Sequence, residues 1–345
     1  MRPVLKPALR QVWRDETTLQ LGLDPARAVV LRGIAAPLAA TLELLDGSRQ
    51  RPELVAAAVA RGAQQSEAEA LLDVLGAAGA LDDAGRDPLL GLDDRARGRL
   101  EPDLASLSLL HDQPGAGAAA LLRRRAAVVH VDGAGRVGAP LARLLDAAGV
   151  GTVTVRDIAP VAPADLSPGG LRPRDVGRDR GAALRERLST GRQVATGTTP
   201  DRPALVVLAP VGGASPPATA LTLAGIPHLL VAVRETTAVV GPLVLPGVTC
   251  CLDCLDLHRG ERDADWPLVA AQLGARTRGG GDACDTALAA VAAGLAALQA
   301  LALLDAPPGA PPPAAAGGTL ELALPDWRVR RRSWAVHPSC PCVPQ

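Results

Sequence analysis

The chain has 345 residues, with equal numbers of acidic and basic side chains and a formal net charge of zero. No net field therefore attracts nucleic acid or an anionic membrane, and the absence of Phe and Tyr leaves few rings on which bases could stack. Apolar residues make up 48% of the chain, enough for a large core, and this length predicts about two domains.

Two segments bear on localisation. The first ten residues contain no apolar run typical of a signal peptide, so we expect a cytoplasmic protein. Residues 286–304 are long and apolar enough to imitate a membrane span. This stretch is mostly Ala, includes Gln299 and follows a cysteine pattern typical of cytosolic metal sites. We therefore expect a buried helix of a soluble protein and no membrane partner.

Residues 1–83 form the first predicted domain. Alternating leucines predict a strand over 18–23, and a turn leads to a second strand over 28–32. Three short helices follow, the third of which is expected to open with a capping box formed by Ser66 and Glu69. A strand pair followed by three helices is a winged-helix-like arrangement.

Residues 84–120 are interrupted by Pro, Gly and Asp and are interpreted as a connector. From 121 to 345 the pattern alternates between apolar strands and helices, which predicts a doubly wound α/β sheet. A Pro/Gly-rich linker over 305–318 precedes a final hairpin over 319–334. The other predicted strands cover 126–132, 152–157, 204–208, 228–233 and 238–245.

The sequence Gly133-Ala-Gly135-Arg-Val-Gly138 directly follows one predicted strand and opens a helix. Such a loop lets the backbone approach a phosphate closely and presents free N–H groups at a helix N-terminus. Asp157 ends the next strand, where an acid usually accepts hydrogen bonds from ribose hydroxyls. The pattern predicts the geometry of a nucleotide site, although glycines here can also serve only the packing of helix on strand.

Two close cysteine pairs, Cys251-x-x-Cys254 and Cys340-x-Cys342, lie far apart in the sequence. Four thiolates from two such pairs suit tetrahedral zinc, and disulfides are not expected in a cytosolic chain. We predict a structural Zn²⁺ that ties the C-terminal tail to the sheet domain; four reduced core cysteines are the alternative. Cys250 adjoins the first pair and is interpreted as a bystander. Cys284 is interpreted as a small buried residue at a helix start, with a reactive thiol as the alternative.

Residues 120–345 resemble the ThiF/MoeB adenylyltransferase domain, which belongs to the ubiquitin-activating-enzyme-like superfamily. The resemblance implies a Rossmann-type fold and, in that family, binding of ATP. The matching segments occur in the family's order: the glycine loop with Asp157, Asp175-Val-Gly177 with Arg180, Gly225-Ile-Pro227, Cys251-Leu-Asp-Cys254 and Leu298-Gln-Ala300.

Residues 251–267 and 337–342 resemble a narrower branch. Its members are ThiF-like proteins that bind the leader peptide of azole- and azoline-modified ribosomal peptides and work with a YcaO cyclodehydratase. The N-terminal domain is similar to the PqqD-like peptide-recognition element of such proteins. The resemblance implies a precursor leader peptide and a YcaO-type cyclodehydratase as partners, and dimers are common for this fold, so a homodimer is also expected.

The sequence departs from the family's catalytic pattern. Where the family places an Asp after the strand matching 204–208, this chain has Ala209-Pro210. The family's Asn-Arg-Gln segment is missing, which leaves Arg172 as a substitute for contacting phosphate, and the family's lysine is replaced by Arg180. Loss of the metal-side carboxylate should cost on the order of several kcal/mol of transition-state stabilisation. We therefore expect a fold that was retained after adenylation chemistry was lost.

DNA binding is disfavoured because residues 1–83 carry nine basic and eleven acidic side chains, and the third predicted helix carries no basic residue. An extended peptide could instead add as a strand beside the sheet, against the third helix. Four apolar residues of that helix are candidates for the groove, although filling the core of the small domain is the favoured role for each: Leu71, Leu72, Val74 and Leu75.

The leading prediction is a leader-peptide-binding scaffold. An ATP-dependent adenylyltransferase that activates a peptide or carrier C-terminus is the alternative and rests on the glycine loop, Asp157 and Arg180. A nicotinamide-dependent oxidoreductase shares the loop but is disfavoured by the cysteine pairs. The charged segment 256–273 is interpreted as either a docking surface or a solvated loop, and its His258 has no identifiable catalytic partner.

Overall fold

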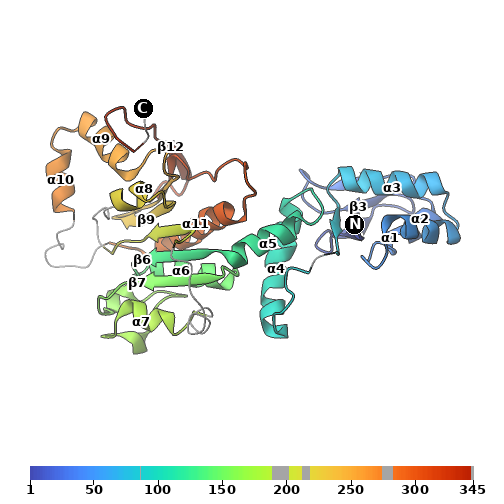
Figure 1. Cartoon of the computed structure of the whole chain (residues 1–345), viewed down its shortest axis with the longest axis horizontal. Helices are drawn as coiled ribbons and strands as arrows, with labels where there is room; N and C mark the ends of the chain where they lie inside the picture. The colour runs from blue at the N-terminus through green and yellow to red at the C-terminus, as the bar shows by residue number, and fades with distance from the viewer. Residues whose placement is uncertain (86, 189–201, 212–217, 274–282, 343–345) are drawn as a thin grey trace. The chain divides into compact units, whose positions relative to one another are not determined.

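The computed structural model describes residues 1–85, 87–188, 202–211, 218–273 and 283–342 (Figure 1). Two compact units make up the chain, Met1–Arg123 and Arg124–Gln345. Helix α5 (Ala116–Ala126) runs from the first into the second. Each unit has its own apolar core.

The first unit contains two small antiparallel sheets and three helices that follow the larger sheet. Both predicted strands and all three predicted helices are present, and three further short strands are not predicted from the sequence. The larger sheet has the order β2 (Gln11–Trp13), β3 (Leu19–Leu21), β4 (Val29–Leu31), and the smaller one pairs β1 (Pro3–Leu5) with β5 (Leu81–Asp83). The helices are α1 (Ala36–Leu42), α2 (Arg51–Ala60) and α3 (Gln65–Ala77).

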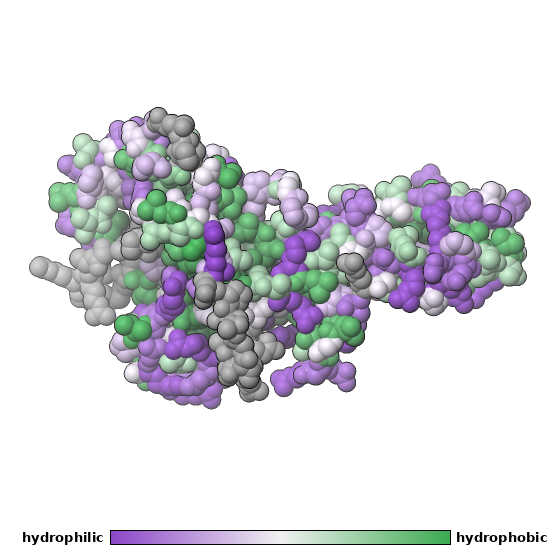
Figure 2. Space-filling model, viewed as in Figure 1, coloured by the Kyte–Doolittle hydropathy of each residue, from purple (hydrophilic) through white to green (hydrophobic). Residues whose placement is uncertain are grey.

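The core of this unit forms where the leucines of β3 meet the helices. Leu19 and Leu21 are fully buried, and so are the inward-facing leucines of α3. Leu71, Leu72 and Leu75 therefore fill the core, whereas Val74 is 49% exposed. In Figure 2 the face of this unit turned toward the viewer carries hydrophilic and apolar residues side by side. The winged-helix-like assignment stays a prediction.

The start of α3 differs from the sequence expectation. The helix begins at Gln65, and the Glu67 carboxylate accepts a hydrogen bond from the backbone N–H of Gln64 at 3.4 Å. Ser66 lies inside the first turn, so the Ser66–Glu69 capping box is wrong. The reason is that the Gln64-x-x-Glu67 spacing satisfies the same geometry two residues earlier.

The segment predicted as a connector is largely helical. It contains α4 (Asp94–Leu110) and the start of α5, and these helices pack through their own small apolar cluster. The two helices approach closely, since a Cβ on Gly117 would lie 2.7 Å from the backbone nitrogen of Ser108. This helix pair leads the chain from the first unit into the second.

The second unit contains a seven-stranded sheet in the order β12-β11-β10-β9-β8-β6-β7 (Figure 1). Strands β6 to β9 are parallel, and β10 to β12 are antiparallel. Because β7 and β8 lie on opposite sides of β6, the order reverses at the end of β6, where such folds bind ligands. The strands are β6 (Val128–Asp132), β7 (Thr152–Arg156), β8 (Leu205–Leu208), β9 (His228–Arg234), β10 (Thr237–Val244), β11 (Gly318–Ala323) and β12 (Val329–Ser333).

Helices cover both faces of this sheet. Alternate residues of β8 enter different cores: Leu205 and Val207 pack with α6 (Gly138–Ala147) and α11 (Thr286–Asp305), whereas Val206 and Leu208 pack near α8 (Thr219–Leu223) and α9 (Leu252–Arg262). The predicted doubly wound α/β architecture is confirmed for this unit. Helix α7 (Arg180–Arg185) packs near β7, and α10 (Trp266–Gln272) follows α9.

Helix α11 is long and apolar enough to cross a membrane by length and composition alone. Its alanine stripe packs against β9, β10 and α6, and Ala289, Ala292 and Ala296 are fully buried there. This is how the core helix of a soluble domain packs, and such helices pass the same composition test.

Two segments that the sequence indicated as irregular are ordered by contacts. The Pro/Gly-rich linker is anchored at its end, because the backbone N–H of Ala315 donates to Gln299 Oε1 at 2.8 Å and both Ala315 and Ala316 are buried. The solvated-loop interpretation of 256–273 is wrong, since α9 and α10 occupy most of it. The many charged residues of α9 mask its helical periodicity in the sequence.

Candidate functional site

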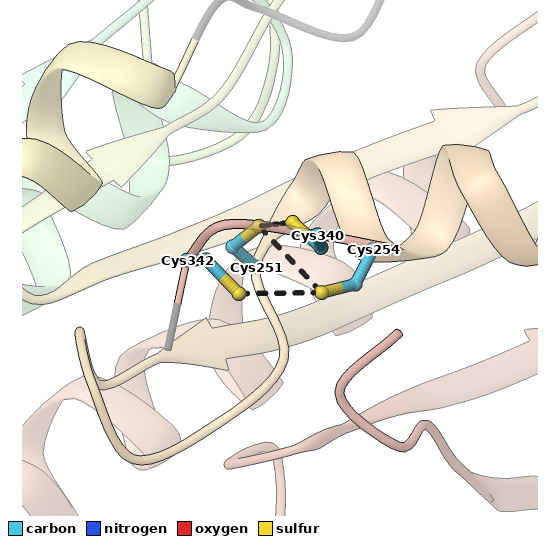
Figure 3. A group of neighbouring side chains, drawn as sticks. All are labelled: Cys251, Cys254, Cys340 and Cys342. Carbon is cyan, nitrogen blue, oxygen red and sulfur yellow. Dashed lines mark hydrogen bonds between the residues drawn. The ribbon is translucent and has the colours of Figure 1, made fainter. Parts of the chain in front are cut away.

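The four predicted zinc ligands come together from two elements (Figure 3). Cys251 immediately precedes α9 and Cys254 lies in its first turn, so the spacing of three places both thiols at the start of the helix. Cys340 and Cys342 belong to the tail after β12. In Figure 3 the four sulfur atoms point toward one another, although the two pairs are about 90 residues apart.

Their spacing fits one tetrahedral zinc ion. The Sγ of Cys251 lies 3.8 Å from that of Cys254 and 3.6 Å from that of Cys340, and the Sγ atoms of Cys254 and Cys342 are 3.4 Å apart. All four lie within 4.8 Å of one another. A tetrahedron with Zn–S bonds of about 2.3 Å has sulfur–sulfur edges of about 3.8 Å. Four protein ligands leave no open position, so such an ion would be structural.

Burial makes two of these thiols poor acids without a cation. It raises the pKa of Cys251 well above its usual range and that of Cys342 to about 12. Burial acts in the same direction on Cys254, but hydrogen bonds from backbone N–H groups, including that of His337 at 3.4 Å from Sγ, lower its pKa. A divalent cation would stabilise the negative charge of several thiolates at once. Four protonated core cysteines would carry no charge and would need no cation.

A second set of side chains reinforces the attachment of the tail to α9. Ser339 N–H donates to His337 Nδ1 at 3.1 Å, so the other ring nitrogen of His337 carries the proton and donates to Glu261 Oε1 at 2.9 Å. His258 Nε2 donates to the backbone carbonyl of Ala335 at 3.1 Å. His258 and His337 thus connect α9 to the tail through hydrogen bonds.

The glycine loop lies between β6 and α6, as predicted. Gly133 has φ +103°, and a Cβ there would lie 2.0 Å from the backbone oxygen of Ala209. A Cβ on Gly138 would lie 2.0 Å from the oxygen of Gly133, and one on Gly135 would meet Val211 Cγ2 at 2.6 Å. Helix–strand packing alone therefore requires Gly133 and Gly138.

Three ionisable residues near this loop are paired with one another: Asp157, Asp165 and Arg180. Asp157 Oδ2 accepts from Ala134 N–H at 2.8 Å and lies 3.4 Å from Arg180 Nη1. The Nε of Arg180 donates to Asp165 Oδ2 at 2.8 Å. Arg180 thus bridges two buried carboxylates, and Asp165 is a member of the site that sequence reasoning missed. The exposed Arg172 is not among the residues that line the adjoining cavity.

The cavity beside the glycine loop has a volume of about 90 Å³. Ligand pockets usually hold about 300–1,000 Å³, so this space is too small for a nucleoside triphosphate. Val211 lies against Gly135 in its wall, Ala209 and Pro210 also line it, and Asp165 is the carboxylate among the described lining residues. The described residues therefore do not fit ATP with its metal in this conformation.

The first unit carries a larger groove of about 720 Å³. Its walls are the turn before β4, the end of α3 and the end of α4. Leu23 and Leu110 are 61% and 60% exposed, which provides apolar surface. Arg10, Arg27, Asp24 and Asp112 supply charges of both signs at the rim.

Comparisons with solved structures show which fold the chain has. Escherichia coli MccB with AMPCPP and MccA is similar over 99% of this chain and 100% of that chain, with a TM-score of 0.71 and 13% identity. E. coli MccB with ATP gives a TM-score of 0.70 at 14% identity over 99% and 100%. PaaA gives 0.65 at 19% identity over 95% and 99%.

No protein-family model matches the sequence, and no curated protein is similar to it. MccB is a ThiF/MoeB-like protein, and its likeness to this chain extends through both units. The chain therefore has a ThiF/MoeB-like fold over nearly its full length.

Proposed function

We propose that the chain is a ThiF-like leader-peptide-binding subunit that presents a precursor peptide to a YcaO-type cyclodehydratase in the cytoplasm. The Cys, Ser or Thr side chains of that peptide would be cyclised by the partner. The observation that carries the proposal is the contrast between the two cavities. The groove of the first unit can hold several residues of an extended peptide, whereas the glycine-loop cavity is small and its acids are already paired.

The groove offers the features that strand addition needs. Strand β4 is an edge of its sheet, so its outward backbone groups can pair with an incoming strand. Apolar side chains of that strand would pack on Leu23, Leu110 and the end of α3, while Arg10 and Asp112 would select for charge. E. coli MccB, which has the same fold, has been crystallised with its peptide MccA, which supports a peptide as the ligand.

Leu23→Arg is expected to weaken leader-peptide binding by the full chain at least tenfold. It places a charge in the apolar wall, and tenfold corresponds to about 1.4 kcal/mol. The probe is a labelled leader peptide encoded by a short Cys/Ser/Thr-rich reading frame, to be identified among the neighbours of the gene, and its binding is measured by fluorescence anisotropy. Val59→Arg changes another exposed apolar residue, on α2 outside the groove, and should bind like the parent protein. Equal affinities for both variants, or no saturable binding, would contradict the proposal.

An ATP-dependent adenylyltransferase is the second candidate. The glycine loop at the start of α6, with Asp157 beside it, favours it, and E. coli MccB has been crystallised with ATP. We expect no peptide-dependent exchange of pyrophosphate into ATP above background, because no unpaired acid among the described lining residues can hold the metal. Exchange that requires the leader peptide would establish the adenylyltransferase instead.

We further propose that Cys251, Cys254, Cys340 and Cys342 hold a structural Zn²⁺ and that the protein forms a homodimer. Helix α11 keeps apolar residues outside the core, with Val291 44% and Leu298 63% exposed. These side chains would be covered in a dimer.

A further inference from the structure

The three-stranded sheet of the first unit has a second edge, strand β2, which the peptide groove at β4 does not involve. Among the described residues β2 pairs only with β3, and all three of its residues are exposed. Arg14 N–H donates to Thr18 and Gly22 N–H donates to Arg10. Because hydrogen-bonded positions alternate along an antiparallel strand, the backbone groups of Gln11 and Trp13 face away from β3.

The side chains of this edge extend the core-facing layer of the sheet. Trp13 is paired with Leu19 and Gln11 with Leu21, and both leucines are buried in the core. Trp13 itself is 47% exposed. A groove of about 740 Å³ lies beside it, and its lining includes three alanines of α1: Ala36, Ala39 and Ala40. The sheet thus ends at β2, and among the described residues no further strand covers these alanines of α1.

The rim of this groove is acidic. Asp15, Glu16 and Glu43 are among its lining residues, and the described lining contains no Lys or Arg. A hydrogen bond from the backbone N–H of Thr17 lowers the pKa of Asp15, which keeps this carboxylate ionised. Glu43 Oε2 lies 3.6 Å from Arg61, which offsets part of the charge. The rim remains net negative.

We propose that this acidic β2 groove binds an extended basic segment of a partner protein, which adds to the sheet as a fourth strand. The backbone groups of Gln11 and Trp13 would pair with it. Its inward side chains, alternately placed, would be small or apolar and pack over Ala36 and Ala39 beside Trp13. Its outward or terminal basic side chains would approach Glu16 and Asp15, and electrostatic complementarity would set the preference for charge.

The probe is the labelled hexapeptide Lys-Val-Lys-Val-Lys-Val, titrated against the full chain by fluorescence anisotropy. We expect saturable binding that weakens as salt is raised, and no binding of the matched Glu-Val-Glu-Val-Glu-Val peptide. Glu16→Lys should weaken binding at least fivefold. Glu69→Lys makes the same change on the exposed surface of α3 outside the groove and should leave binding unaltered.

Gln11→Pro provides the second test. It removes an N–H that faces away from β3, so the β2–β3 pairing should survive, as circular dichroism would verify, while hexapeptide binding falls at least fivefold. Leu23→Arg, in the other groove, should not affect the hexapeptide, which separates this inference from the proposed function. Equal binding of both hexapeptides, unchanged binding by Glu16→Lys and Gln11→Pro, or loss of binding in Leu23→Arg would overturn it.

Discussion

Cys340→Ser is expected to abolish stoichiometric zinc binding and to lower the melting temperature of the second unit more than any other single exchange proposed for this protein. Structural zinc in small sites contributes roughly 10–16 kcal/mol of apparent binding free energy, so loss of one of four thiolates removes several kcal/mol of folding free energy. The tail that carries Cys340 and Cys342 would lose its attachment to α9. Metal analysis should find about one zinc per parent chain and far less in the variant.

Cys250→Ser is the matched control. Cys250 is 1% exposed and adjoins the site, but its sulfur is not one of the four. Burial raises its pKa to about 11, so it stays a neutral thiol at physiological pH. This variant should keep its zinc, with a small loss of stability from a buried hydroxyl. A parent protein that is free of zinc and fully stable, or a Cys250→Ser variant that loses the metal equally, would contradict the assignment.

Arg180→Met is expected to lower the free energy of unfolding by about 3–5 kcal/mol, the range for removing one partner of a buried ion pair. Its guanidinium lies between Asp157 and Asp165, whose side chains are 10% and 6% exposed. Without it, two carboxylates face one another at low solvent exposure. Urea denaturation monitored by circular dichroism measures the difference.

Arg178→Met tests whether the effect belongs to the bridging position. Arg178 is two residues away and 42% exposed, and it pairs with Glu186 and, at 3.7 Å, with Asp175. The pair with Glu186 is exposed, and such pairs contribute about 0–1 kcal/mol. Asp175 is fully buried, but it keeps its ion pair with Arg187 when Arg178 is removed, so this variant should be close to the parent. If Arg180→Met were as stable as Arg178→Met, the ion pairs of Arg180 would not be needed for stability. Arg180 could then bind a phosphate group, and the adenylyltransferase would become the favoured function.

Much of the second unit could be predicted from the sequence because its strands are buried on both faces. Such strands appear as short apolar runs, and 204–208 and 228–233 match β8 and β9 closely. The convergence of the four cysteines could also be predicted, since two close pairs are the spacing typical of a metal site.

The short strands of the first unit could not be predicted in the same way. Strand β2 has three exposed residues, and β1 pairs with β5 across nearly 80 residues of chain. Three residues carry too little alternation to be distinguished from a turn, and their pairing is set by the helices that close the core. The surface charge of α9 likewise masked a helix.

The α/β alternation, the position of the glycine loop and the identity of the four converging cysteines could be predicted from the sequence, because each depends on residue type and local spacing. Their surroundings could not, because these depend on contacts between remote segments. Asp165 meets Arg180, and Val211 stands against Gly135, through packing between separate loops and strands. Ion pairing and cavity volume are properties of distances between segments remote in sequence, and those distances exist only once the sheet has formed.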